Sequence, residues 1–173
     1  MSTLSIKELS HPSGEVIKIA AGKTLDLKSQ GTTTLPTGSV LQVVQATSTT
    51  TQTTTSSSFI QYSSLTATIT PTSTSSKILI SSTVEANIRL NGGSNMSTKC
   101  LIYRDSSAVS REIEMRGYDY GGSGLYLVGH MPIEHLDAPS TTSAITYSIY
   151  YRNLAGTDTN INSGSITLME IQG

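Results

Sequence analysis

Apolar and hydroxyl-bearing residues alternate along much of the chain, which is the period of a β-strand. Residues 65–70 read Leu-Thr-Ala-Thr-Ile-Thr, and residues 145–152 alternate isoleucine and tyrosine with more polar positions. A period of two places every second side chain on the same side of a sheet. No window of a dozen residues has the apolar spacing of an amphipathic helix. The pattern therefore predicts strands and no long helix.

Nine segments have the strand pattern, and turn-forming residues separate most of them. Eight or nine short strands in about 130 residues are typical of a two-sheet sandwich and not of alternating strands and helices. We therefore predict an all-β, antiparallel, jelly-roll-like sandwich of about eight strands. The segments are 40–45, 59–62, 65–70, 77–90, 99–105, 109–116, 125–131, 144–152 and 163–172.

Residues 46–58 consist almost entirely of threonine and serine. We expect a solvated loop, or an edge strand whose threonines face water on both sides. The alternative is a surface that carries glycans or contacts a ligand. Residues 156–160, Gly-Thr-Asp-Thr-Asn, could offer oxygen ligands to calcium, but they lack a later bidentate acid and are expected to form a turn.

Residues 1–39 are predicted to form an extended arm, and residues 40–173 the sandwich domain. The turn-forming sequence Leu-Pro-Thr-Gly at 35–38 marks the boundary. The arm has a few short apolar pieces, which one extended chain cannot bury by itself, so we expect them to anchor it on another surface. The anchoring residues are Ile6, Val16, Ile17, Ile19, Leu25 and Leu27.

Composition excludes several classes of protein. The chain has 173 residues with 28 serines and 26 threonines, only 13% charged residues and a net charge of −1. It lacks the basic surface that nucleic-acid binding needs, and no apolar run approaches the length of a membrane span. The N-terminus does not have the pattern of a secretory signal. A single cysteine excludes an internal disulfide and fits synthesis in a reducing cytoplasm.

The best metal candidate is the group His130, Glu134, His135 and Asp137, whose nitrogen and oxygen atoms suit zinc. An odd spacing places the two histidines on opposite faces of a strand, and Pro132 would break a helix that could gather them. We therefore expect a polar strand-to-turn segment, with no metal and no cofactor.

Catalytic candidates are also weak. Cys100 lies in an apolar strand, where burial raises the pKa of a thiol, so we expect a core residue. A polysaccharide depolymerase would need two carboxylates in a groove. The available pairs are Glu112 with Glu114 and Glu134 with Asp137, and both lie in predicted surface strands or turns. We therefore expect a protein that is not an enzyme.

The loop at 117–124 has the character of a binding loop. Tyr118 and Tyr120 could stack on a sugar ring while Asp119 accepts hydrogen bonds from its hydroxyls. The alternative is that one tyrosine packs on the edge of the sandwich and the other covers a subunit contact.

Short motifs in the first 90 residues, and one further along, point to a class of protein. They are MSTL at 1–4, HPSG at 11–14, GKTLDL at 22–27, LPTGSVLQVV at 35–44, SFI at 58–60, LTATITP at 65–71, SSKILI at 75–80 and IYRDS at 102–106. In these motifs the chain resembles fibre-like or capsid-decoration proteins of marine tailed phages that infect cyanobacteria. The resemblance implies an N-terminal arm, a compact β-domain and no catalytic residue.

The resulting hypothesis is a virion structural protein on the exterior of the particle, in contact with other capsid or tail proteins. We expect a homotrimeric fibre, spike or head-decoration component, with Val40, Val43 and Val44 in the seam between copies. The alternatives are a tip protein that binds a host-surface receptor or glycan, and a lectin-like module.

Overall fold

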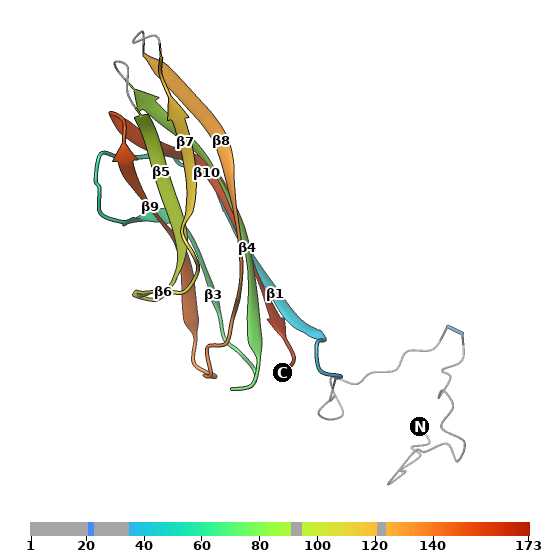
Figure 1. Ribbon diagram of the computed structural model, residues 1–173. Coiled ribbons are helices and arrows are strands. Elements are labelled where there is room, and N and C mark those ends of the chain that lie inside the picture. The colour runs from blue at the N-terminus through green and yellow to red at the C-terminus, as the bar shows by residue number, and fades with distance from the viewer. Residues whose placement is uncertain (1–20, 23–34, 91–94, 121–123) are drawn as a thin grey trace, which may run out of the picture. The chain divides into compact units, whose positions relative to one another are not determined.

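The computed structural model describes residues 21–22, 35–90, 95–120 and 124–173. The helices and strands assigned in these ranges are all β-strands, with no helix among them (Figure 1). In the described part of the chain, no helix is long and apolar enough to cross a membrane. The strands are β1 (Val40–Ser48), β2 (Gln52–Thr54), β3 (Ile60–Ile69), β4 (Lys77–Leu90), β5 (Asn95–Arg104), β6 (Ser107–Ala108), β7 (Ile113–Tyr118), β8 (Leu125–Asp137), β9 (Ile145–Ala155) and β10 (Asp158–Ile171).

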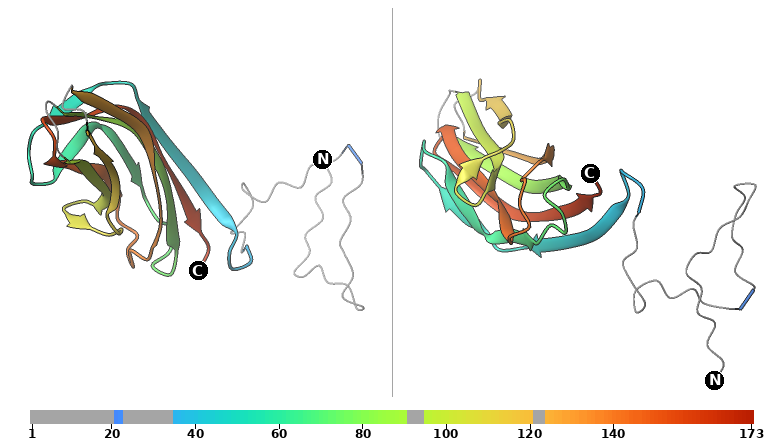
Figure 2. Two further views of the ribbon diagram at one scale, coloured as in Figure 1. Left: turned by 45° about the horizontal axis from the view of Figure 1, so that its top comes forward. Right: turned by 90° about the horizontal axis from the view of Figure 1, so that it is seen from below.

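The strands form two antiparallel sheets that face each other across a common interior (Figure 2). Sheet A has the order β1-β10-β4-β8, and β2 also pairs with β10. Sheet B has the order β3-β9-β5-β6, and β7 also pairs with β5. The predicted all-β, two-sheet antiparallel sandwich is confirmed.

The order of the strands is that of a jelly roll. β1 and β2 pair with successive stretches of β10, and β6 and β7 with successive stretches of β5, so each pair is one interrupted edge strand. Counted in this way there are eight strands. Sheet A then has the first, eighth, third and sixth, and sheet B the second, seventh, fourth and fifth. Two interleaved Greek keys produce this order.

The hydrophobic core lies between the two sheets and follows the alternation in the sequence. Along β4 every second side chain points inward, and its neighbours lie on the outer face of sheet A. The inward isoleucines and valines are each worth about 1.5–3 kcal/mol when fully buried. The largest fully buried side chains are Tyr62, Tyr147, Tyr151, Leu65, Ile69, Ile78, Ile80, Ile88, Met96, Ile102, Ile149 and Ile161.

Two core tyrosines hold the threonine-rich segment against the sandwich. The rings of Tyr62 and Tyr151 meet edge to face, with centroids 6.5 Å apart. The Tyr62 hydroxyl donates to the carbonyl oxygen of Thr50 at 2.5 Å, and that of Tyr151 to the carbonyl oxygen of Gln52 at 2.8 Å. A buried hydroxyl needs such a partner, so these bonds position the backbone of residues 50–52.

The threonine-rich segment therefore differs from expectation. β1 continues to Ser48, and β2 adds three more residues to the same edge of sheet A. The edge-strand alternative is correct for these parts, but the expectation that the threonines face water on both sides is wrong for Thr54, which is buried. The reason is the pairing of β2 with residues 159–161 of β10, which places Thr54 opposite Thr159.

Several strand boundaries also differ. Residues 130–137 belong to β8 and do not form a turn, because they pair with β4 along their full length. Residues 158–160 open β10, and the turn consists of Gly156 and Thr157. The two strands predicted at 59–62 and 65–70 are one strand, β3 (Ile60–Ile69), with an irregular register between Gln61 and Thr66. The predicted strand at 109–116 begins only at Ile113.

A carboxylate ties the two sheets together at one end of the sandwich. Asp137 on β8 accepts a hydrogen bond of 2.6 Å from the Tyr147 hydroxyl on β9 and one of 2.7 Å from Arg104 on β5. Burial, followed by the hydrogen bond to Asp137, raises the pKa of Tyr147 above its ordinary value, so the hydroxyl keeps its proton. The three side chains thus form a stable link between sheet A and sheet B.

The chain divides into two units, Met1–Leu35 and Pro36–Gly173, and all of the strands described above belong to the second. The backbone of the second unit is fastened before β1 begins. Gly38 donates to the carbonyl oxygen of Gln172 and Gln172 donates to that of Ser39, each at 2.8 Å. An arm that ends at residue 39 remains a prediction.

Candidate functional site

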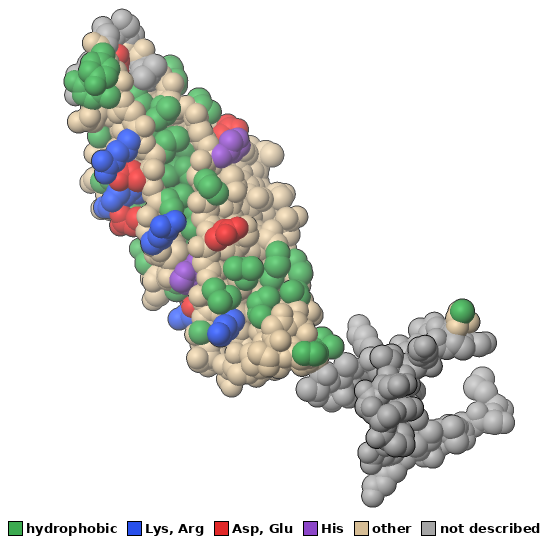
Figure 3. Space-filling view, turned by 45° about the vertical axis from the view of Figure 1, so that its right-hand side comes forward, with side chains coloured by type: hydrophobic (Ala, Val, Ile, Leu, Met, Phe, Trp, Pro, Cys, Tyr) green, Lys and Arg blue, Asp and Glu red, His purple; other side chains and the backbone are tan. Residues whose placement is uncertain are grey.

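The outer face of sheet A carries a continuous row of hydrophobic side chains, here called the outer row. Val43 on β1 lies opposite Met169 on β10, Met169 opposite Leu79 on β4, and Leu79 opposite Leu136 on β8. Val43 is 57% exposed and Leu136 51%. Figure 3 shows hydrophobic side chains gathered near the lower end of this face. The row reaches from one edge strand of sheet A to the other.

A β-bulge adds Val40 to the same surface. Val43 is three positions after Val40, so strict alternation would place them on opposite faces. The register shifts between Val40 and Gln42, and both valines are exposed. A bulge inserts one residue and re-aims the side chains before it. Val40 lies opposite Ile171, which extends the hydrophobic surface beyond the outer row.

Val44 does not belong to this surface. It is partly buried and packs against the core, as alternation after Val43 requires. Of the three valines predicted for a seam between copies, the structure thus places Val40 and Val43 outward and Val44 inward. The anchoring residues Ile6, Val16, Ile17, Ile19, Leu25 and Leu27 lie outside the described residues, and their role stays a prediction.

The outer row was not predictable from the sequence, because its members come from four distant segments. Leu79, Leu136 and Met169 each lie in an alternating segment where half of the positions face outward. The sequence alone does not say which hydrophobic residues of a mixed strand face out, nor which of them align. The available signal was a hydrophobic residue that alternation places on the same face as a charged one. Leu136, two residues after Glu134, is an example.

The predicted binding residues Tyr118, Asp119 and Tyr120 have different environments. Tyr118 ends β7 and is 47% exposed, and Tyr120 is 94% exposed. Their rings contact each other with centroids 4.3 Å apart. Asp119 is buried and interacts within the protein. A role for Asp119 in accepting hydrogen bonds from a ligand does not fit this burial.

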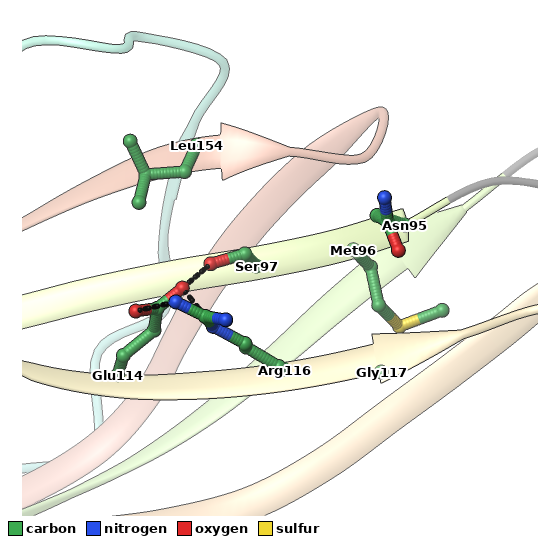
Figure 4. Close-up of a pocket in the computed structure, with 7 residues that line it drawn as sticks. All are labelled: Asn95, Met96, Ser97, Glu114, Arg116, Gly117 and Leu154. Atoms are coloured by element: carbon green, nitrogen blue, oxygen red, sulfur yellow. Dashed lines mark hydrogen bonds and ion pairs between the residues drawn. The ribbon is translucent and has the colours of Figure 1, made fainter.

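A pocket of about 280 Å³ lies beside Tyr118 on the outer side of sheet B (Figure 4). Asn95, which lines it, is the register partner of Tyr118, so the two side chains lie on the same face of sheet B. The pocket combines polar groups with a small apolar surface. Its lining residues are Asn95, Met96 and Ser97 of β5, Glu114, Arg116 and Gly117 of β7, and Leu154 of β9.

Glu114 and Arg116 form the polar centre of this pocket, and Figure 4 shows Glu114 directed toward Ser97 and the guanidinium of Arg116 directed toward Glu114. Glu114 Oε1 accepts from Arg116 Nε and from the Ser97 hydroxyl, each at 2.5 Å, and Oε2 accepts from Arg116 Nη2 at 2.8 Å. The hydrogen bonds from Arg116 and then Ser97 lower the pKa of Glu114 to about 2. The carboxylate is therefore ionised at every physiological pH.

The neighbouring carboxylate, Glu112, is also held by cations. Lys99 Nζ lies 2.8 Å from it and Arg152 Nη2 lies 3.3 Å from it. The hydrogen bond from Lys99 is the largest cause of its lowered pKa. A general acid needs a raised pKa, so neither Glu112 nor Glu114 is suited to that role in glycoside hydrolysis.

The carboxylates of the second candidate pair, Glu134 and Asp137, lie on opposite sides of sheet A. Glu134 lies on the exposed side of β8, whereas Asp137 points toward the interior and bonds Tyr147. His130 and His135 are likewise on opposite sides of β8, as their odd spacing predicts. Among the residues that the structure describes, no three His, Cys, Asp or Glu side chains lie together as a metal site would require.

Cys100 is a core residue, as predicted. It is fully buried on β5, with its Sγ 3.8 Å from the Sδ of Met131 on the facing sheet. Burial raises the pKa of the thiol to about 12. A thiol that keeps its proton at neutral pH is a poor nucleophile.

No protein-family model and no curated protein matches the chain. Two solved virus structures contain a similar chain. One, of the T13 IBDV viral particle, has 12% identity and a TM-score of 0.42, over 84% of this chain and 35% of that chain. The other, of infectious bursal disease virus Gx strain, has 15% identity and a TM-score of 0.44, over 87% and 36%. This chain thus spans about a third of each.

Proposed function

We propose that this chain is a non-enzymatic structural protein of a virus particle, whose copies associate through the outer row of sheet A. The observation that carries the proposal is the outer row itself. Four strands each place a hydrophobic side chain in one line, with Val43 and Leu136 half exposed at its two ends. Removing such surface from water is favourable by about 25 cal/mol per Å².

A second copy of the same chain is the partner that fits this surface. The row has hydrophobic side chains at both edges of the sheet, so one end of the row can pack against the other end of the row on the next copy, which is the heterologous contact that a closed ring requires. The net charge of −1 produces little repulsion between copies. We extend the proposal to a homotrimer, because the motifs of the N-terminal half resemble those of phage fibre and decoration proteins.

The proposed place of the protein is the exterior of the virion, as a fibre, spike or head-decoration component. Residues 1–39 would anchor it on other capsid or tail proteins through their apolar pieces. The jelly-roll fold is compatible with this place but does not select it, since viral capsid proteins and lectins both have this fold. The engaged carboxylates Glu112, Glu114 and Asp137 support a role that is structural and not catalytic.

Light scattering on the full chain tests the association. We expect a trimer at micromolar concentration, and a monomer after Val43→Asp, because the new charge would be buried in the contact. Gln45→Asp is the matched control, since it adds the same charge to the same face of β1 beyond the outer row. A monomeric wild-type protein, or a trimer that survives Val43→Asp, contradicts the proposed contact.

Antibodies against the β-domain test the place of the protein. In a virus that encodes the chain, we expect immunogold label on the outside of intact purified particles. Label that appears only after the particles are disrupted would contradict the external position. Presence in the infected lysate but absence from purified particles would contradict a structural role in the virion.

A further inference from the structure

The proposed association through sheet A does not involve the pocket between β5, β7 and β9. The pocket lies on the outer side of the other sheet, so it remains open when copies meet at the outer row. Its volume of about 280 Å³ lies just below the range of typical ligand pockets, which begins near 300 Å³. That space suits one small ring and not a long ligand.

From the geometry of this pocket we infer that it binds one neutral sugar ring of a saccharide, with Glu114 and Arg116 on its hydroxyls and Tyr118 against its face. This goes beyond the structural role proposed above and does not depend on it. The inference takes its residues from three strands that the fold brings together.

Glu114 and Arg116 supply an acceptor and a donor side by side. A carboxylate has about four lone-pair positions, and the bonds from Arg116 and Ser97 use three of them. Arg116 has five N–H donors, of which Glu114 takes two, and its side chain is largely exposed. Sugar hydroxyls both donate and accept, so neighbouring hydroxyls can bond to the pair together. The amide of Asn95 adds a further donor and acceptor at the rim.

The charges favour a neutral ligand over a phosphate or a carboxylate. Among the residues that line the pocket, the positive charge of Arg116 is paired with Glu114, whose lowered pKa keeps it ionised and whose Oε2 lies 3.9 Å from Lys99 Nζ. An anion that approached Arg116 would therefore meet a fixed negative charge beside it. A neutral ring avoids this repulsion and still receives charge-assisted hydrogen bonds, which are stronger than those between neutral groups.

The remaining walls suit the face of a sugar ring. Leu154, 40% exposed on β9, supplies apolar surface to the lining, while Met96, which also lines the pocket, has its own side chain fully buried in the core. Tyr118 is the register partner of Asn95, so it neighbours the pocket on the same face of sheet B, and its ring contacts that of Tyr120. Tyrosine offers a rigid apolar face at low entropic cost, which is why binding surfaces use it so often. Any side chain at position 117 would crowd Met96, whose Cγ lies 3.0 Å from a Cβ built there.

Saturation-transfer NMR on the full chain tests the inference, with methyl glycosides of glucose, mannose and galactose as probes. We expect saturation transfer to at least one probe. Tyr118→Ala and Glu114→Gln should each weaken binding roughly tenfold or more, as loss of one strong contact would. Tyr126→Ala is the matched control, since Tyr126 is also an exposed tyrosine, on β8 of the other sheet.

The outcomes are distinct. Binding that is lost in the two pocket variants and kept in Tyr126→Ala supports the inference. Absence of saturation transfer to all three probes overturns it, as does binding that persists in Glu114→Gln and Tyr118→Ala. Circular dichroism confirms that each variant is folded. Light scattering on the same samples separates this result from the oligomeric state, so failure here leaves the association through sheet A untouched.

Discussion

Thr72 donates two hydrogen bonds to one carboxylate oxygen of Glu170, from its backbone N–H and from its hydroxyl, each at 2.7 Å. Glu170 lies on β10 with no exposed surface, and its other oxygen accepts from Gln42 of β1 at 2.6 Å. Burial alone would raise the pKa of Glu170, but the hydrogen bonds, with those from Gln42 and Thr72 among them, outweigh it and lower the pKa. An ionised glutamate thus fastens β10, β1 and the β3–β4 loop together.

This arrangement predicts a loss of stability in acid. The unfolded glutamate has a pKa of about 4.3, and the folded value is lower. The stabilisation is therefore complete above about pH 4.3 and is lost as the pH falls through the folded pKa. Glu170→Gln should lower the free energy of unfolding by roughly 1–3 kcal/mol at neutral pH, and the difference from wild type should shrink in acid.

Urea unfolding followed by circular dichroism at a series of pH values measures this difference. Glu134→Gln is the matched control, because Glu134 is exposed on β8 and the same change there should leave stability unchanged. A gap between wild type and Glu170→Gln that stays constant from neutral pH into acid would show that the ionised carboxylate does not contribute.

Gly164 predicts a second effect on stability. A Cβ added there would lie 2.8 Å from Val84 Cγ1 and 2.9 Å from Leu65 Cδ2, inside the packed core. Overpacking of this kind costs about 1–3 kcal/mol, so Gly164→Ala should lower the midpoint of urea unfolding. Gly129→Ala is the comparison. Its new methyl would meet only the Sδ of Met115, a flexible side chain, and should cost less. Equal midpoints would contradict this packing.

Cys100 predicts an absence of thiol reactivity in the native protein. Because the thiol is buried with a pKa of about 12, a disulfide reagent at mildly alkaline pH should react only after unfolding in guanidinium. The measurement is the release of the coloured leaving group over time. Thr74→Cys adds an exposed thiol as the control, and one equivalent should react at once. Rapid reaction of the wild-type chain would mean that the core opens readily.

Much of the fold was predictable because it depends on local pattern. The alternation in residues 65–70 predicted which side chains of that part of β3 are buried, and residues 77–90 were predicted as one strand, which is β4. The proline and glycine positions predicted several of the turns. Strand ends were less predictable, since they depend on the partner. Residues 130–137 read as a polar turn until β4 pairs with them, and residues 52–54 read as solvated until β10 covers them.

The candidate sites also contain some residues that were predictable from the sequence and others that were not. Tyr118 and Tyr120 could be singled out from a glycine-rich loop, but the burial of Asp119 could not be foreseen. Glu114 and Arg116 appeared in the sequence only as outward charges of a strand. Their meeting with Ser97 depends on the register of β5 with β7, which no local pattern contains.

By itself, the sequence determined the fold class, because side-chain alternation and the solvation of hydroxyl groups act over a few residues. It also determined the burial of Cys100, which follows from an apolar strand. The tertiary structure alone decided that Val43, Met169, Leu79 and Leu136 form one row, and that a bulge turns Val40 toward it. Both depend on the register between strands far apart in the chain, and that register is set by the packing of the whole sandwich.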